Sequence, residues 1–411
     1  MTQQFAINLN SPDFKADPYP VFARVRSEDP VHLTEFPGNR QGWMITSYEE
    51  AEKVLRDPRF VKDPRHVFTL EQLQKQFPAQ NAQNKEHEQA FAFSRNMLGS
   101  DPPDHTRLRS LVSLSFTPRL IEQWHERIQA ITNELLDAVQ DKGEMDLVNA
   151  LAFPLPLIVI TEMLGIPPED GMKFRAWSNS VIEASGNPET FRKRQGELIE
   201  FREYLRLLIN EKRKQLSDDL ISLLIRNEEG GDKLSEGELI AMVFLLLVAG
   251  HETTVNLISN GALALMTHPE QMQALREHPE MLKPAVEEFL RFHGPLMTAT
   301  QRWAIEDVEL AGKLIRKSDY VVVILASANH DPAAFHNPDE LDITRSSNPH
   351  IAFGKGIHYC LGAPLARLEG QIAIGTLLQR MPHLQLAVDP KDLVWRPGAL
   401  IMGLRALPVT F

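Results

Sequence analysis

The sequence predicts a mainly α-helical protein with a smaller β portion, folded as one unit of 411 residues. Apolar residues recur at three- and four-residue spacing from about Thr106 to Thr267, which is typical of packed helices. Segments that read as strands are short and lie outside that region. No internal repeat or low-complexity linker divides the chain. With 43% hydrophobic and 24% charged residues, the composition supports a large packed core and excludes disorder as the main state.

Charge and cysteine content exclude several classes of function. The chain carries 43 Lys+Arg and 55 Asp+Glu, a net charge of −12, which argues against a nucleic-acid partner. The single cysteine, Cys360, excludes an internal disulfide and any multi-cysteine zinc or iron–sulfur site. The N-terminus has no basic start followed by an apolar run, so we expect no signal peptide, no membrane anchor and a cytoplasmic location.

The first hundred residues contain mixed elements. Gly42–Ile45 reads as a short strand and Tyr48–Arg56 as a helix that ends before Asp57-Pro58. The stretch Val61–Leu98 is rich in Gln, Asn and Phe and only weakly periodic. Such a long irregular segment in a compact protein is usually functional, and we expect it to cover a binding pocket with Phe68, Phe77, Phe91 and Phe93.

A long central helix is predicted from Ser235 to Thr267. Ser235 and Glu238 form a capping-box pattern at its start, and about 33 residues would span roughly 50 Å at 1.5 Å per residue. The apolar run Leu239–Gly250 is too short to cross a membrane and favours a buried core helix. The polar cluster His251-Glu252-Thr253-Thr254 therefore falls near the middle of a buried helix.

The C-terminal third alternates elements with loops. We expect a helix over Pro284–Arg291, a strand over Tyr320–Ala326, a coil over His330–Pro349 and a helix over Leu361–Arg380.

The loop before the last of these helices contains the lone cysteine. Gly354 and Gly356 allow a tight turn and a close approach to something flat. A thiolate at a helix N-terminus is stabilised by free N–H groups, which favours Cys360 as a metal ligand. The alternative is a small buried hydrophobic residue.

The cysteine loop resembles the haem-binding signature of the cytochrome P450 family, Phe-Gly-x-Gly-x-His-x-Cys-x-Gly. The matching residues are Phe353, Gly354, Gly356, His358, Cys360 and Gly362. The resemblance, which is to soluble bacterial members, implies the cytochrome P450 fold, with haem between the long central helix and the cysteine loop. It also implies haem b as cofactor and Cys360 as its axial thiolate, a ligand that favours O–O cleavage.

The cluster in the central helix resembles the family's acid–alcohol pair. By this resemblance, Glu252 and Thr253 would relay protons to dioxygen. The alternative is a bent core helix with a satisfied Glu, since a Thr side chain can bond back to an earlier carbonyl. A zinc peptidase is excluded because His251-Glu252 would need a second His at position 255, which is Val.

Two further groups of residues match the family. His105 and Arg109, four apart on a predicted helix, together with Arg302 and His358, resemble the partners of the haem propionates. A second group, formed by Glu288, Arg291 and Arg345, resembles the buried charge triad that locks the cysteine loop.

The substrate pocket is expected above the small residues Ala249 and Gly250. By resemblance, two apolar segments should line it; they are Leu296, Met297 and Thr298, and Leu400, Ile401 and Met402. Such a lining suits a fatty acid, polyketide or macrolide, or steroid-like molecule, either free or tethered to a carrier protein.

The predicted function is that of a haem–thiolate monooxygenase that hydroxylates or epoxidises an apolar small molecule. The resemblance implies a ferredoxin or flavodoxin with an NAD(P)H-dependent reductase as partners. Candidate docking charges for them are Lys355, Arg107, Arg119 and Arg367. Two alternatives stay open: a peroxide-driven peroxygenase, and a non-catalytic haem sensor or electron carrier.

Overall fold

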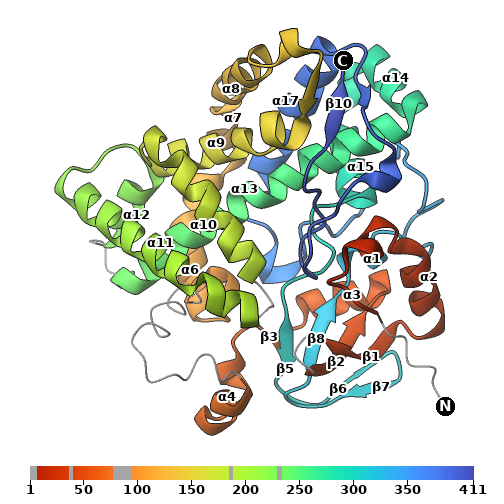
Figure 1. The fold of residues 1–411 in the computed structure, drawn as a ribbon. Helices are drawn as coiled ribbons and strands as arrows, with labels where there is room; N and C mark the ends of the chain where they lie inside the picture. Colours follow the sequence, from red (N-terminus) through yellow and green to blue (C-terminus); the bar gives the residue numbers. More distant parts are fainter. Residues whose placement is uncertain (1–6, 37–39, 77–94, 185–187, 229–233) are drawn as a thin grey trace.

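The computed structural model describes residues 7–36, 40–76, 95–184, 188–228 and 234–411. Helices form most of the fold, and strands β1, β2, β3, β5 and β8 gather at one end beside the N-terminal helices (Figure 1). The helices are α1 (Pro12–Ala16), α2 (Tyr19–Glu28), α3 (Tyr48–Arg56), α4 (Leu70–Gln76), α6 (Asp104–Ser113), α7 (Pro118–Glu122), α8 (His125–Asp137), α9 (Pro154–Leu164), α10 (Gly171–Ala184), α11 (Pro188–Lys214), α12 (Leu220–Glu228), α13 (Glu236–Thr267), α14 (Pro269–Glu277), α15 (Leu282–Phe292), α16 (Leu325–Ala328) and α17 (Ala363–Arg380). The strands are β1 (Val31–Phe36), β2 (Arg40–Ile45), β3 (Phe60–Val61), β4 (Glu144–Asp146), β5 (Arg302–Ala304), β6 (Val308–Leu310), β7 (Lys313–Ile315), β8 (Tyr320–Val323), β9 (Gln385–Leu386) and β10 (Pro408–Thr410). The mainly α class with a smaller β portion is thus confirmed.

The largest sheet has the strand order β1-β2-β8-β5-β3. Only the pairing of β2 with β8 is parallel, and it sets Gly42 opposite Tyr320. A Cβ at Gly42 would lie 2.7 Å from the Tyr320 carbonyl oxygen, so this strand pairing needs glycine.

The strand predicted over 320–326 is wrong at its end. The β-branched run stops at Ile324, and Leu325–Ala328 turns into α16, a short helix of good helix formers.

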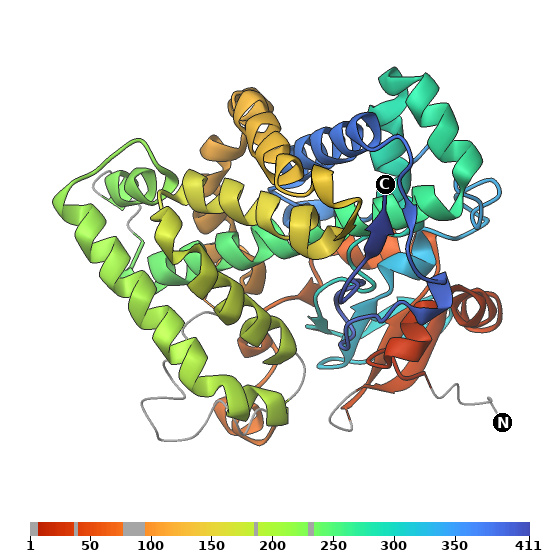
Figure 2. The same cartoon turned by 45° about the horizontal axis from the view of Figure 1, so that its top comes forward.

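Helix α13 crosses the centre of the molecule (Figure 2), as the sequence predicts. Its capping box is formed: the Glu238 carboxylate accepts from the Ser235 amide at 2.8 Å, and the Ser235 hydroxyl accepts from the Glu238 amide at 3.3 Å. Helix α13 has the length and hydropathy of a membrane span, but 67% of its most apolar window is buried inside the fold. It packs on α9, α15 and α17 and is the core helix of the molecule.

The other predicted elements differ from the structure mainly at their ends. Helices α15 and α17 occupy the predicted positions with slightly shifted ends, and the coil over 330–349 contains no helix or strand. The segment from 61 to 98 is less irregular than expected, because α4 and short 3-10 turns lie within its described parts. Phe68 packs with Val61, Val67 and Trp303 in a small buried cluster beside the sheet rather than over a pocket. Phe77, Phe91 and Phe93 lie outside the described residues.

Candidate active site

The cysteine loop is a tight turn held by its own backbone. The Cys360 amide donates to the Phe353 carbonyl at 2.9 Å, and the Gly354 amide donates to the Ile351 carbonyl at 2.8 Å. Gly354 and Gly356 have φ angles of +69° and +70°, a region that favours glycine. A Cβ at Gly356 would lie 2.7 Å from the Leu55 carbonyl oxygen. The second glycine is therefore needed for a close approach to helix α3.

The thiol of Cys360 lies at the floor of a cavity, two residues before the cap of α17. Burial raises its pKa, and this outweighs the opposite effect of the Gly362 and Ala363 amides and of the Arg109 and Arg367 guanidinium groups. The amides at the start of α17 thus favour the thiolate as expected, but burial outweighs them. Coordination to a metal ion would deprotonate this thiol.

The structure brings the four predicted propionate partners together at one edge of the cavity. His105 and Arg109 share one face of α6, and the rings of His105 and His358 are 4.4 Å apart. Arg302 on β5 is only 4% exposed, and burial lowers its pKa to about 10. Burial, reinforced by the surrounding cations, lowers the pKa of His358 to about 2.

Lys62 is a fifth member of this cluster that the sequence analysis missed. Its side chain is buried, and its ammonium donates to the Thr300 carbonyl at 2.8 Å and to the Thr300 hydroxyl. Burial and the nearby Arg302 hold the pKa of Lys62 well below its usual value. A buried lysine has no local sequence signature, because lysine is normally a surface residue.

This cationic edge fits an acidic cofactor. Both ring nitrogens of His105 are buried without a hydrogen-bond partner among the described residues. The carboxylate of Asp101 is occupied by the backbone amides of Lys62 and Asp63. Arg109 and Arg302 lie with Lys62 in a largely apolar setting in which Asp101 offsets part of their charge, so anionic groups would be stabilised here, and two propionates would supply them.

Opposite the cysteine, helix α13 presents Ala249, Gly250, Glu252 and Thr253 to the cavity. The Thr253 hydroxyl donates to the Ala249 carbonyl at 2.9 Å, the back-bonding that the sequence analysis considered. Its acceptor lone pairs stay available on the cavity side. A Cβ at Gly250 would lie 3.2 Å from Ile160, so this glycine also lets α9 pack closely.

Glu252 has an unpredicted partner. Its Oε1 lies 2.7 Å from a guanidinium nitrogen of Arg396, while its Oε2 has no hydrogen-bond partner among the described residues. Burial raises the pKa of Glu252, and Arg396 opposes that rise. The two residues are 144 positions apart, so no local pattern in the sequence links them.

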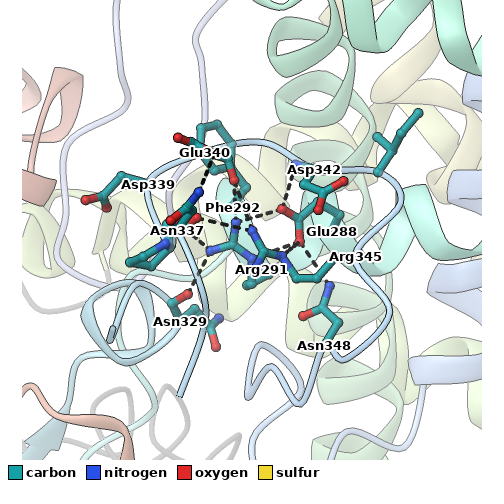
Figure 3. A network of polar contacts seen from close by, with 12 residues as sticks. Glu288, Arg291, Phe292, Asn329, Asn337, Asp339, Glu340, Asp342, Arg345 and Asn348 are labelled. Atoms are coloured by element: carbon teal, nitrogen blue, oxygen red, sulfur yellow. Dashed lines mark hydrogen bonds and ion pairs between the residues drawn. The ribbon is translucent and has the colours of Figure 1, made fainter. Parts of the chain in front are cut away.

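The predicted charge triad is formed between α15 and the coil that follows α16 (Figure 3). Glu288 is fully buried and accepts from Arg291 at 2.7 and 2.8 Å and from Arg345 at 3.1 Å. The Asp342 amide and the Asn348 side chain also donate to it. The Arg291 guanidinium also donates to backbone carbonyls of the coil after α16, so helix α15 holds that coil in place.

The cavity between α13 and the cysteine loop has a volume of about 400 Å³ and a mostly apolar lining. Leu296, Leu400 and Ile401 line it as predicted. Met297, Thr298 and Met402 do not. These three are buried in the protein, and the cavity-facing positions beside them belong to other residues, Pro295, Ala299 and Thr300 among them.

Comparisons with known proteins agree with this site. The sequence model described as "Cytochrome P450" matches residues 184–402. The polyketide biosynthesis cytochrome P450 PksS of Bacillus subtilis (strain 168) is 44% identical over 97% of this chain and 96% of its own length. The structure of the myxobacterial cytochrome P450 CYP267B1 with myristic acid is 42% identical, with a TM-score of 0.91 and 98% of each chain covered. The structure of P450BioI with a hexadec-9Z-enoic acid-ligated acyl carrier protein is 39% identical, with a TM-score of 0.88 over 98% of this chain and 100% of the other. The chain therefore belongs to the cytochrome P450 family of haem-containing oxidoreductases.

Proposed function

We propose that residues 1–411 form a single catalytic domain that binds haem b and acts as a monooxygenase on an apolar small molecule, hydroxylating or epoxidising it. The main support is that Cys360, Glu252 and Thr253 line one mostly apolar cavity. When a surrogate ferredoxin and reductase supply electrons to the enzyme under ¹⁸O₂, one labelled oxygen atom should appear in the product. Product formed only from added hydrogen peroxide would instead identify a peroxygenase, and haem reduction without product would identify a carrier or sensor.

The residues present fit the haem. Cys360 would bind the iron, and His105, Arg109, Arg302 and His358 would hold the propionates, with Lys62 beside them. When bound, the haem supplies the activation of dioxygen and the insertion of one oxygen atom into the substrate. The apolar walls orient the substrate and exclude water from the reacting bond.

Proton delivery falls to α13 in this proposal. The Thr253 hydroxyl, fixed by its bond to Ala249, would accept a hydrogen bond on the cavity side and so order the oxygen pocket. Glu252, next to it and buried, would hold the proton at its carboxylate.

Thr253→Ala should uncouple electron use from product formation. Substrate should still bind and NAD(P)H should still be consumed, but product per NAD(P)H should fall roughly tenfold or more, with a matching rise in hydrogen peroxide. The control is Thr267→Ala, which removes the same kind of back-bond, from the hydroxyl to the Leu263 carbonyl at 2.9 Å, at the far end of α13. Wild-type coupling in Thr253→Ala would assign the task to Thr254 or to water.

For the substrate, we propose a fatty acyl chain or a polyketide-like ring, free or tethered to a carrier protein. The apolar lining supports this class, as do the relatives: one is named for polyketide biosynthesis and two are solved with fatty acyl ligands. Long-chain fatty acids should then change the haem absorption spectrum on titration, whereas small polar acids should not.

Ala249→Phe should weaken that spectral response. Its ring would fill the space beside Thr253, and overpacking of this kind costs about 1–3 kcal/mol. The carbon monoxide spectrum should stay intact. Ala249→Gly, which keeps the space open, is the control. Equal binding of the same ligands by Ala249→Phe would place the pocket elsewhere.

Electrons would come from a ferredoxin or flavodoxin with an NAD(P)H reductase, in the cytoplasm. Of the four proposed docking charges, Arg119 is exposed. The other three are engaged within the chain: Arg107 with Glu238, Lys355 with Glu52, and Arg367 with Glu287. Arg119 is therefore the first choice for a charge-reversal test of partner affinity.

A further inference from the structure

A row of buried polar side chains runs along α13 from the cavity toward the C-terminal end of the helix. Glu252, Asn256 and Asn260 are spaced four residues apart, so they share one face of the helix, and each is 2% exposed or less. This face lies against residues 395–404, which we call the C-terminal arm. Polar groups this deeply buried need partners, and the arm supplies one to Glu252, from Arg396, and one to Asn260, the Met402 carbonyl.

The contacts between α13 and the arm are specific. The side-chain amide of Asn260 donates to the Met402 backbone carbonyl at 2.9 Å. A Cβ at Gly403 would collide with the Asn256 side chain, so the arm approaches the helix as closely as glycine allows. The side-chain amide of Asn256 is itself fixed within α13, because it donates to the Glu252 backbone carbonyl at 2.7 Å. These contacts fix the register of the arm along the helix.

The backbone fold of the arm places the Arg396 side chain next to Glu252. Trp395 and Leu404 form a bridge, and the Arg396 amide donates to the Gly403 carbonyl at 2.8 Å. The ammonium of Lys15, a fully buried residue of α1, donates to the Arg396 carbonyl at 2.8 Å and to the Ile401 carbonyl. The backbone of Arg396 is thus held from two sides, and its guanidinium meets Glu252 Oε1 at 2.7 Å.

Arg396 is the cation that balances Glu252. His251 Nε2 lies 3.9 Å from Glu252 Oε2, but the two ring nitrogens of His251 are hydrogen-bonded to the Ser178 hydroxyl and the Leu247 carbonyl. Burial lowers the pKa of His251 to about 4, so its ring is neutral near pH 7. Lys15 reaches only backbone carbonyls of the arm. The Arg396 side chain is 20% exposed against 2% for Glu252, so it leads from the buried acid toward solvent.

We propose that Arg396 is a positioning residue for Glu252, which holds the carboxylate in place and marks the side on which it takes up its proton from solvent. This inference rests on the proposed proton delivery by Glu252. In each cycle the carboxylate gains one proton from solvent on the Arg396 side and releases one toward Thr253, and the guanidinium keeps its own protons throughout. The arm that lines the cavity thereby also sets the acidity of the proton donor.

The test compares Arg396→Gln with Arg396→Lys. Loss of the cation removes the main effect that opposes burial, so the pKa of Glu252 should rise further. The carbonyl infrared band of the protonated acid, identified by its loss in Glu252→Gln, should then persist to higher pH. Product per NAD(P)H near neutral pH should fall, because a weaker acid releases its proton less readily. Arg396→Lys should restore both, and substrate affinity should change little.

The control is Arg405→Gln, which removes an exposed arginine just after the arm. Gly403→Ala, which forces the arm away from Asn256, should reproduce part of the Arg396→Gln effect. If Glu252→Gln uncouples the enzyme but Arg396→Gln leaves the infrared band and the coupling as in wild type, the inference is overturned and the proposed function stands. If Glu252→Gln itself has wild-type coupling, the proposed role of Glu252 fails. Should Arg396→Gln not fold, a folded Arg396→Lys that behaves like Glu252→Gln would also overturn the inference.

Discussion

Glu288→Ala is expected to lower the free energy of unfolding by about 3–5 kcal/mol, because it leaves buried cations without their carboxylate. Arg291 is 1% exposed and loses a bidentate partner at 2.7 and 2.8 Å, and Arg345 loses its contact at 3.1 Å. Denaturant unfolding measures the effect directly. Little haem-loaded protein should be recovered, because the coil that these arginines hold precedes the cysteine loop.

Glu280→Ala is the matched control for this experiment. Glu280 lies just before α15 and pairs with His278 at 3.1 Å, but its side chain is 73% exposed, so its loss should change the free energy of unfolding little. A Glu288→Ala protein as stable as Glu280→Ala would contradict the structural role of the triad.

Cys360→Ser should abolish thiolate ligation and monooxygenase activity together. Cys360 is the only cysteine of the chain, so no other thiol can take its place. The reduced wild-type protein with carbon monoxide should show the red-shifted Soret band that the family resemblance implies. Cys360→Ser should lack it, because a hydroxyl is a far weaker donor to iron.

Tyr359→Phe controls for disturbance of the loop, since it keeps the Tyr359 carbonyl that Arg109 binds at 2.7 Å. This variant should retain the red-shifted band. Persistence of the band in Cys360→Ser would show that Cys360 is not the ligand of the iron.

The sequence predicts best the features that depend on local spacing. The capping box at Ser235 fixes the start of α13, and the three-residue spacing of Glu288 and Arg291 puts both on one turn of a helix. The lone cysteine and its glycines locate the loop for the same reason. Such patterns are contained within one turn or one loop, so tertiary packing changes them little.

The residues missed are those whose role depends on distant parts of the chain. Arg396 follows a tryptophan in an irregular segment, and only the packing of the arm against α13 brings it to Glu252. Lys62 similarly becomes buried because it meets the Thr300 carbonyl, 238 positions away. The prediction of the pocket lining failed at Met297 for a related reason: its amide donates to the Leu400 carbonyl and the Ala299 amide donates to the Val323 carbonyl, so contacts with distant segments decide which side chains face the cavity.

The bond from Lys15 to the Arg396 carbonyl joins residues 381 positions apart and ties the two ends of the chain together. Proteins open locally in cooperative units, and segments that share buried contacts open as one. We therefore expect helix α1 and the arm to open together, although they lie near opposite ends of the described sequence. Widening of the pocket on the arm side would thus be controlled by the docking of the N-terminal helix.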